Sequence, residues 1–226
     1  MKLALVGYGK MGRIVDSLAA EHGFGVIAKI DVGDSLELAR SADAVIEFST
    51  PHVAVDNLLA LAQLGVPVVC GTTGWLDQLP RVREAVDKAG TTLVYSSNFS
   101  IGVNVFLRVA AEAARLMKDE ASYGAWGWEM HHAAKKDAPS GTMFSIVETM
   151  RAAGYDRAID VSSNRVGAVP GTHEIGFDSA ADTITLRHTA RSREGFARGA
   201  LKAALWLTAH RDQRGVFEFR DIIFKG

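Results

Sequence analysis

The chain begins Met1-Lys-Leu-Ala-Leu-Val-Gly-Tyr-Gly-Lys-Met-Gly12, and this stretch decides the fold. The apolar run over residues 2–6 predicts a short buried strand, and a G-x-G-x-x-G loop over residues 7–12 follows it at once. Apolar residues then recur at helical spacing, and a second strand predicted over 25–30 ends at Asp31. Strand, glycine loop, helix, strand and acidic residue in this order form the fingerprint of a dinucleotide-binding βαβ unit.

The glycine loop and Asp31 predict a site for a nicotinamide dinucleotide. Glycines let the backbone approach a pyrophosphate, which the start of the following helix attracts. The Asp31 carboxylate would accept hydrogen bonds from the adenosine ribose and would repel a 2′-phosphate, which favours NADH. Lys10 and Arg13 in the loop would offset that repulsion. NADH and NADPH therefore stay open as alternatives, and use of both is the working hypothesis.

Strands and helices keep alternating up to residue 102. Further strands are predicted over 42–48, 66–70 and 91–95, with helices over about 51–64 and 79–89. This alternation predicts an α/β fold, a Rossmann-type doubly wound parallel sheet. Asp34 and Glu37 resemble a capping box that opens a very short helix between two of the strands.

Ligands of such sheets bind beyond the carboxyl ends of the strands. Loops of small and polar residues follow the predicted strands of this chain, although each loop taken alone could be an ordinary turn. The candidate cofactor-binding residues in these loops are Gly7, Tyr8, Gly9, Lys10, Met11, Gly12, Asp31, Thr50, Gly71, Thr72, Thr73, Ser96, Ser97, Asn98 and Phe99.

Beyond residue 102 the pattern changes. A long amphipathic helix is predicted over 103–117, followed by strand-like runs that are grouped together: 124–128, 160–166, 173–177 and 183–188. Grouped strands predict a smaller α+β domain with a mixed sheet and one layer of helices. We expect one domain over 1–102, to which the segment 195–226 returns, and a second domain over 103–194 that binds the substrate.

The residue types needed for proton transfer gather in Glu129-Met-His-His-Ala-Ala-Lys-Lys-Asp-Ala-Pro-Ser-Gly-Thr142. His131 and His132 would point to opposite sides of an extended backbone, so that one can face a cleft. Ser140 opens a helical pattern, and the free N–H groups of a helix start attract carboxylates. Each part also has an ordinary structural explanation, but their proximity favours a site for a carboxylate-bearing substrate that must receive a proton.

Composition excludes several classes of protein. The chain has 226 residues, 48% of them hydrophobic, and a net charge of -1, so nothing in its charge favours nucleic acid or an anionic membrane. The apolar run after Lys2 is too short for a signal peptide or a membrane span, which predicts a cytoplasmic protein. A single cysteine, Cys70, excludes an intramolecular disulfide framework, and adjacent histidines that diverge do not predict a metal site.

Seven stretches together resemble the dihydrodipicolinate reductase family, also called 4-hydroxy-tetrahydrodipicolinate reductase, of lysine and diaminopimelate biosynthesis. The most specific is the run E-x-H-H-x-x-K-x-D-A-P-S-G-T over residues 129–142. The others are 9–13, 71–74, 97–104, 165–173, 188–193 and 196–200. The resemblance covers nearly the whole chain.

The resemblance implies that a nicotinamide hydride reduces a cyclic dicarboxylate to tetrahydrodipicolinate, with loss of water. It implies His131 as the proton donor and Lys135 as a second donor. His132, Lys135 and the Ser140, Gly141 and Thr142 backbone would hold the substrate carboxylates. A homotetramer formed through the sheet of the second domain is also implied.

Two other functions remain alternatives at this point. Another amino-acid dehydrogenase of the same fold would share the glycine loop, although the 129–142 run argues against it. A dinucleotide-binding sensor without catalysis would leave His131 and Lys135 without a purpose.

Overall fold

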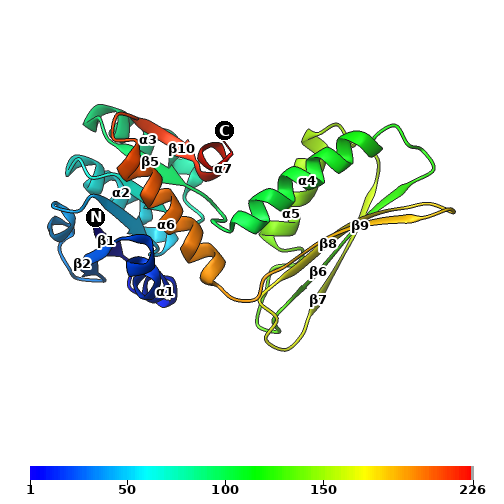
Figure 1. The fold of residues 1–226 in the computed structure, drawn as a ribbon, viewed down its shortest axis with the longest axis horizontal. Helices are drawn as coiled ribbons and strands as arrows, with labels where there is room; N and C mark the ends of the chain where they lie inside the picture. Colours follow the sequence, from blue (N-terminus) through cyan, green and yellow to red (C-terminus); the bar gives the residue numbers. More distant parts are fainter. Residues whose placement is uncertain (225–226) are drawn as a thin grey trace. The chain divides into compact units, whose positions relative to one another are not determined.

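The computed structural model describes residues 1–224 and divides into two compact units (Figure 1). The first unit comprises Met1–Ser100 together with the chain from Glu194 onward, and the second comprises Ile101–Arg193. Each unit has its own sheet and its own apolar core. No helix in the described part of the chain is long and apolar enough to cross a membrane.

The first unit is built on a six-stranded sheet in the order β10-β5-β4-β3-β1-β2, with all neighbours parallel. Its strands are β1 (Lys2–Val6), β2 (Gly25–Ile30), β3 (Ala44–Glu47), β4 (Val68–Cys70), β5 (Thr92–Tyr95) and β10 (Gly215–Glu218). Its helices are α1 (Lys10–Ala19), α2 (Pro51–Gln63), α3 (Leu79–Ala89), α6 (Glu194–Ala209) and α7 (Phe219–Ile223). Short 3-10 turns lie at Ala20–His22, Leu36–Ala39 and Leu76–Gln78.

Both faces of this sheet are buried, which explains the continuous apolar runs of its strands. On β1, Leu3 and Leu5 join the core beneath α1 and α6, whereas Ala4 and Val6 join the core beneath α2 and α3. Helices therefore cover both faces, and the predicted doubly wound parallel sheet is confirmed.

One local prediction in this unit is wrong. The turn after β2 is capped by Ser35, whose hydroxyl accepts a hydrogen bond from the Glu37 amide at 3.3 Å. Asp34 does not cap it; its carboxylate accepts instead from the Asp31 amide at 2.9 Å. The apolar segment after α6, for which the sequence predicted no element, forms β10, which pairs in parallel with β5, and then α7.

The second unit has a mixed four-stranded sheet in the order β7-β6-β8-β9. Its strands are β6 (Gly124–His131), β7 (Ile159–Arg165), β8 (Thr172–Asp178) and β9 (Thr183–Thr189). Helices α4 (Ile101–Met117) and α5 (Gly141–Ala152) lie on one face of this sheet (Figure 1) and share its apolar core. Strand β6 extends three residues past the predicted end at 128, so Glu129 and His131 lie on a strand.

Candidate active site

Polar side chains from three strands meet on the helix-covered face of the second sheet. Burial alternates along β6 and places Glu129 and His131 on the inner face, while Trp128 and Met130 are only half-buried. Directly beside Glu129 lie Ser163 on β7 and His173 on β8, and β7 also carries Arg165 opposite His131. The strand register thus brings together residues that are more than 30 positions apart in the chain.

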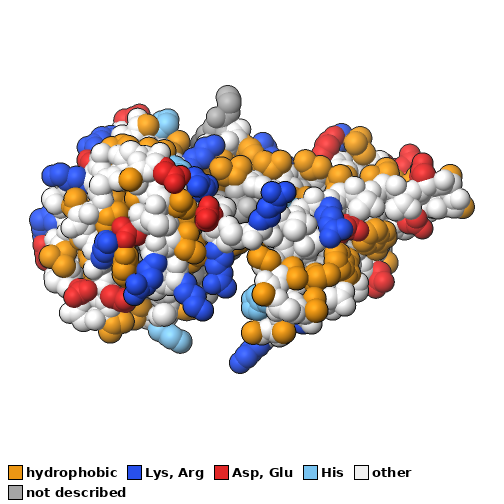
Figure 2. Space-filling model, turned by 60° about the horizontal axis from the view of Figure 1, so that its bottom comes forward, with side chains coloured by type: hydrophobic (Ala, Val, Ile, Leu, Met, Phe, Trp, Pro, Cys, Tyr) orange, Lys and Arg blue, Asp and Glu red, His pale blue; other side chains and the backbone are white. Residues whose placement is uncertain are grey.

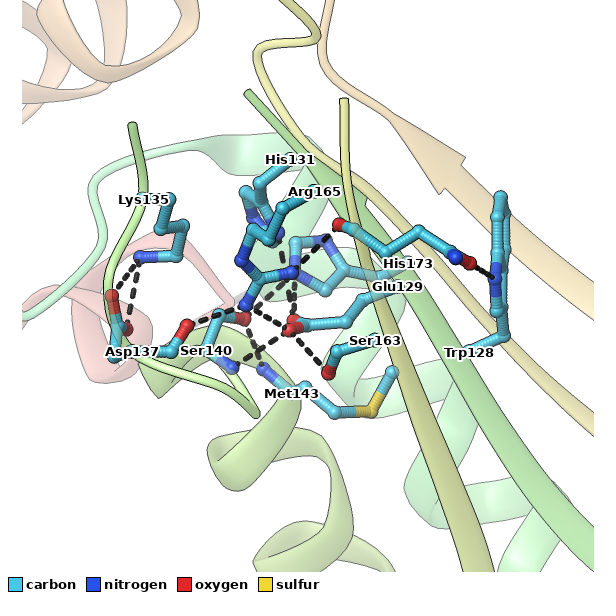
Figure 3. A network of polar contacts seen from close by, with 11 residues as sticks. Trp128, Glu129, His131, Lys135, Asp137, Ser140, Met143, Ser163, Arg165 and His173 are labelled. Atoms are coloured by element: carbon cyan, nitrogen blue, oxygen red, sulfur yellow. Dashed lines mark hydrogen bonds and ion pairs between the residues drawn. The ribbon is translucent and has the colours of Figure 1, made fainter. Parts of the chain in front are cut away.

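Glu129 is fully buried at the centre of this group (Figure 3). Its Oε1 accepts hydrogen bonds from the Ser140 amide at 2.9 Å, the Ser163 hydroxyl at 2.9 Å and the Arg165 guanidinium at 2.8 Å. Burial alone would raise the pKa of this carboxyl, but these hydrogen bonds outweigh burial and lower the pKa below its usual value. Glu129 is therefore an ionised carboxylate.

The other oxygen of Glu129 faces two imidazoles. Oε2 lies 3.7 Å from Nδ1 of His131 and 3.6 Å from Nε2 of His173, and the two rings are edge to face with centroids 4.9 Å apart. Burial lowers the pKa of His131 against the opposing effect of the Glu129 charge. Burial, followed by repulsion from His131, lowers the pKa of His173 to about 4. His173 is therefore neutral at pH 7.

The loop after β6 supplies a cation beside the start of α5. Nζ of Lys135 lies 2.8 and 2.9 Å from the two carboxylate oxygens of Asp137. The Lys135 hydrogen bond lowers the Asp137 pKa, and the Gly141 backbone N–H contributes in the same direction. Asp137 thus places a carboxylate between an ammonium and a helix start, which is the environment predicted for a substrate carboxylate.

The other predicted substrate-binding residues differ in how they are arranged. His132 is half-buried, and its carbonyl accepts from the Lys135 amide at 3.0 Å. Ser140 is buried: its hydroxyl caps α5 by accepting from the Met143 amide at 3.1 Å, and its own amide is bound to Glu129. Gly141 and Thr142 open the helix and are more accessible than Ser140.

Sequence reasoning assigned no role to Glu129, Ser163, Arg165 or His173. Arg165 and His173 open and close one of the stretches that carry the family resemblance, which is the only signal the sequence gives for them. Their grouping follows from strand pairing across β6, β7 and β8, which periodicity does not reveal.

Glu129, His131 and His173 offer three ligand atoms within 4.8 Å of one another, as a metal site would. The Arg165 guanidinium, however, already neutralises the carboxylate, and the Ser140 hydroxyl lies 3.2 Å from Nε2 of His173. We interpret the cluster as a hydrogen-bonding and proton-transfer network because its charge is already balanced by protein groups.

In the first unit, the loop between β1 and α1 fits a pyrophosphate. Gly7 has φ +85°, and a Cβ there would lie 2.3 Å from the Phe48 carbonyl oxygen; a Cβ on Gly12 would lie 2.4 Å from the Gly7 carbonyl oxygen. Gly9 is the N-cap of α1 and provides no side-chain cap, and the first turn has no acidic residue. The N–H groups of this helix start are therefore available for an anion.

Other predicted cofactor-binding residues surround this loop. Asp31 is exposed directly after β2, and Thr50 is exposed at the N-cap of α2. The Tyr8 hydroxyl donates to Asp16, and its ring lies 5.1 Å from both the Arg13 guanidinium carbon and Nζ of Lys29. Two cations thus lie beside Tyr8 of the glycine loop, one of them, Lys29, paired with Asp16 at 2.7 Å.

The loops after β4 and β5 complete the set. Thr72 is buried, and its hydroxyl has no hydrogen-bond partner among the described residues, as expected of a group that awaits a ligand. The Ser96 hydroxyl is bound to the Asn98 carbonyl at 2.9 Å. The Phe99 side chain is 2% exposed and packs against Phe219, so only its backbone can reach a ligand. Lys10, Thr73 and Ser97 are exposed, and Met11 and Gly71 are half-buried.

A doubly wound unit with a glycine loop before its first helix, joined to a mixed-sheet unit that carries buried histidines, is the architecture of two-domain dinucleotide-dependent oxidoreductases. The chain matches the family models "Dihydrodipicolinate reductase, N-terminus" over residues 1–99 and "Dihydrodipicolinate reductase, C-terminus" over 102–223. It belongs to the dihydrodipicolinate reductase family.

Individual relatives agree with this assignment. The chain is 35% identical to a 4-hydroxy-tetrahydrodipicolinate reductase of Christiangramia forsetii, with 99% of this chain and 98% of the relative covered. It is 32% identical to the enzyme of that name from Archaeoglobus fulgidus, with 99% and 100% covered. The fold resembles the dipicolinate-bound dihydrodipicolinate reductase from Paenisporosarcina sp. TG-14, with a TM-score of 0.81, 20% identity and coverage of 98% and 99%.

A more distant resemblance shows how widely the fold is shared. Aspartate dehydrogenase from Thermotoga maritima matches with a TM-score of 0.52 at 10% identity, covering 92% of this chain and 96% of that one. Fold alone therefore does not separate the reductase from other amino-acid dehydrogenases, and the family match does.

Proposed function

We propose that the protein reduces 4-hydroxy-tetrahydrodipicolinate to tetrahydrodipicolinate in lysine and diaminopimelate biosynthesis. One observation carries this proposal. The buried His131 is accompanied by the Lys135 ammonium and the start of α5, and these two groups already hold the Asp137 carboxylate. Family membership supplies the substrate. NADH or NADPH would supply a hydride when it is bound.

His131 supplies the proton in this proposal. Reduction of the conjugated ring adds hydride to one carbon and a proton to its neighbour, and water leaves from the hydroxylated carbon. Burial lowers the His131 pKa in the ligand-free protein. A substrate with two carboxylates would raise this pKa again, because nearby negative charge stabilises imidazolium. Substrate binding thus charges the acid that the reaction uses.

Lys135 and the start of α5 bind the substrate carboxylates. A substrate carboxylate would take the place of Asp137 beside Nζ of Lys135, with His132, Gly141 and Thr142 around it. Lys135 would also offset the negative charge that develops on the substrate ring. As a second donor, Lys135 would protonate that ring. Residues Gly7 to Gly12, Asp31, Thr50 and the loops after β4 and β5 would hold the dinucleotide.

We further propose a cytoplasmic homotetramer that assembles through the second sheet. Helices α4 and α5 cover one face of this sheet, and the other face carries the half-buried Trp126, Trp128 and Met130. Figure 2 shows hydrophobic side chains gathered on the surface of this unit. Half-exposed aromatic side chains on one sheet face are typical of an interface between subunits.

A coupled assay tests the reaction. Dihydrodipicolinate synthase, pyruvate and aspartate semialdehyde generate the substrate, and oxidation of NADH or NADPH is followed by absorbance with the wild-type protein, His131→Gln and Lys135→Ala. We expect oxidation that requires the synthase product and falls at least about 100-fold in each variant, the usual contribution of a general acid.

Two outcomes would change the assignment. Full turnover in both variants would keep the enzyme but discard His131 and Lys135 as its donors. Dinucleotide binding without turnover on the synthase product would instead favour the sensor.

A further inference from the structure

We propose that Glu129 is the positioning residue of the active site: its Oε2 holds a proton on Nδ1 of His131, so that Nε2 is the nitrogen that donates to the substrate. This inference deepens the proposed function and rests on His131 as the proton donor. Glu129 itself would touch neither substrate nor cofactor, because it is fully buried.

The two oxygens of Glu129 have separate tasks. Oε1 is saturated by three donors, the Ser140 amide, the Ser163 hydroxyl and the Arg165 guanidinium. These bonds fix the plane and the rotamer of the carboxylate. Oε2 is buried and has no hydrogen-bond partner within the described chain, yet it lies 3.7 Å from Nδ1 of His131. A small movement of the His131 ring would therefore form a hydrogen bond from Nδ1 to Oε2 and satisfy both groups.

The buried nitrogen of His131 is Nδ1, which also has no hydrogen-bond partner among the described residues. This leaves Nε2, near Gly171, as the nitrogen able to reach a substrate. The space there is narrow, since a Cβ on Gly171 would lie 3.1 Å from Nε2. A carboxylate behind one ring nitrogen fixes the tautomer and the orientation of the other nitrogen.

The second imidazole, that of His173, does not compete with His131 for the proton. His173 faces the same oxygen, at 3.6 Å from its Nε2, and lies near His131, His188 and Lys135, all of which oppose a charge on it. Burial and these neighbours lower the pKa of His173 to about 4. Because two imidazoliums would repel each other, Glu129 stabilises only the charge on His131.

In the proton-transfer step, the Nε2–H bond of imidazolium His131 breaks and the proton bonds to the ring atom next to the one that receives hydride. The imidazole is left neutral with its remaining proton on Nδ1, hydrogen-bonded to Oε2 of Glu129. Solvent protonates Nε2 again before the next turnover.

Glu129→Gln tests the tautomer directly, because the three donors around Oε1 require an oxygen acceptor at that position. They fix the amide oxygen in the Oε1 position and direct the NH₂ group toward His131, where it donates to Nδ1. The neutral ring must then carry its proton on Nε2. Ser163→Ala is the matched control: it removes one bond to Oε1 and leaves the charge and Oε2 in place.

The first readout is the tautomer of His131, measured by two-bond ¹H–¹⁵N correlation NMR on ¹⁵N-histidine-labelled, ligand-free protein at pH 7.5. His131→Gln assigns the resonance by its absence. We expect the Nδ1–H tautomer in the wild type and in Ser163→Ala, and the Nε2–H tautomer in Glu129→Gln. This measurement needs no turnover, so it tests the geometry even if the proposed reaction fails.

The second readout is the pH dependence of kcat in the coupled assay. The charges facing His131 are those of Glu129, Lys135, Arg165 and Asp137. Loss of the Glu129 carboxylate should move the basic limb of the profile to lower pH by about one pH unit or more and lower kcat about 100-fold. The KM for NADH should change less than about twofold, and Ser163→Ala should keep the wild-type limb.

The outcomes separate the two proposals. An Nε2–H tautomer in the wild type, or a Glu129→Gln profile that coincides with the wild type, would overturn the positioning role. The expected tautomers without reduction of the synthase product would support the geometry and reject the reaction. If Glu129→Gln does not fold, Glu129→Asp replaces it in the assay. Its shortened carboxylate should leave the basic limb of the kcat profile at the wild-type pH while lowering kcat.

Discussion

The buried His173 should make the stability of the protein depend on pH, and replacing it with glutamine should remove that dependence. His173 is 5% exposed, and burial together with repulsion from His131 lowers its pKa from 6.5 to about 4. A histidine in the unfolded chain keeps its ordinary pKa. Between these two values the unfolded chain binds a proton that the folded protein does not bind.

The magnitude follows from this difference. The stability associated with neutral His173 is fully present above pH 6.5 and is lost as the pH falls through about 4. At about 1.4 kcal/mol for each tenfold change, the loss over this window amounts to about 3 kcal/mol. Glutamine does not titrate, and its Nε2 can occupy the place of the imidazole Nε2 beside Glu129 and the Ser140 hydroxyl. The His173→Gln variant should therefore lack this contribution to the pH dependence of the free energy of unfolding.

Urea unfolding followed by far-UV circular dichroism, at one protein concentration and at several pH values from 7.5 to 4.5, measures the effect. The free energy of unfolding of His173→Gln minus that of the wild type should rise by about 2–3 kcal/mol as the pH falls over this range. His52→Gln, which replaces an exposed histidine on α2, is the control and should follow the wild type. Parallel curves for the wild type and His173→Gln would refute the reasoning, because His173 would then protonate equally in both states.

Three further predictions concern the cofactor and the assembly. Gly12→Ala should weaken NADH binding at least about tenfold in a fluorescence titration, because the new Cβ would lie 2.4 Å from the Gly7 carbonyl oxygen, whereas Gly25→Ala, with open space around it, should bind normally. Asp31→Asn should raise the ratio of kcat/KM for NADPH to that for NADH about tenfold by removing a charge that repels a 2′-phosphate; an unchanged ratio would place the adenosine elsewhere. Trp128→Glu should dissociate the tetramer in light scattering coupled to gel filtration, and a tetramer that persists would exclude this sheet face as the interface.

The sequence determined the fold class, and for physical reasons that are local. Continuous apolar strands, the helical periodicity between them and the glycine loop of residues 7–12 are all properties of neighbouring residues. The start of α5 at Ser140 was predicted in the same way, because an N-cap serine acts within one turn. The residues of the 129–142 run were recognised as a candidate site, but the roles given to His131 and Lys135 remain predictions.

Local patterns failed where an element depends on distant partners. The sequence predicted no strand after α6, and β10 forms there because β5 offers it an edge to pair with. The capping prediction failed for a different, local reason: the adjacent Ser35 caps the turn, and the Asp34 carboxylate accepts from the Asp31 amide.

Only the tertiary structure decided which groups surround the histidines. Glu129 could be read from the sequence as the first residue of a motif, but its partners Ser163, Arg165 and His173 reach it through the register of β6 with β7 and β8. That register is fixed by the burial of one whole face of the sheet beneath α4 and α5, since a slip by one residue would turn every side chain to the other face. Periodicity therefore specified which elements form, and the pairing of distant strands specified the electrostatic environment of the site.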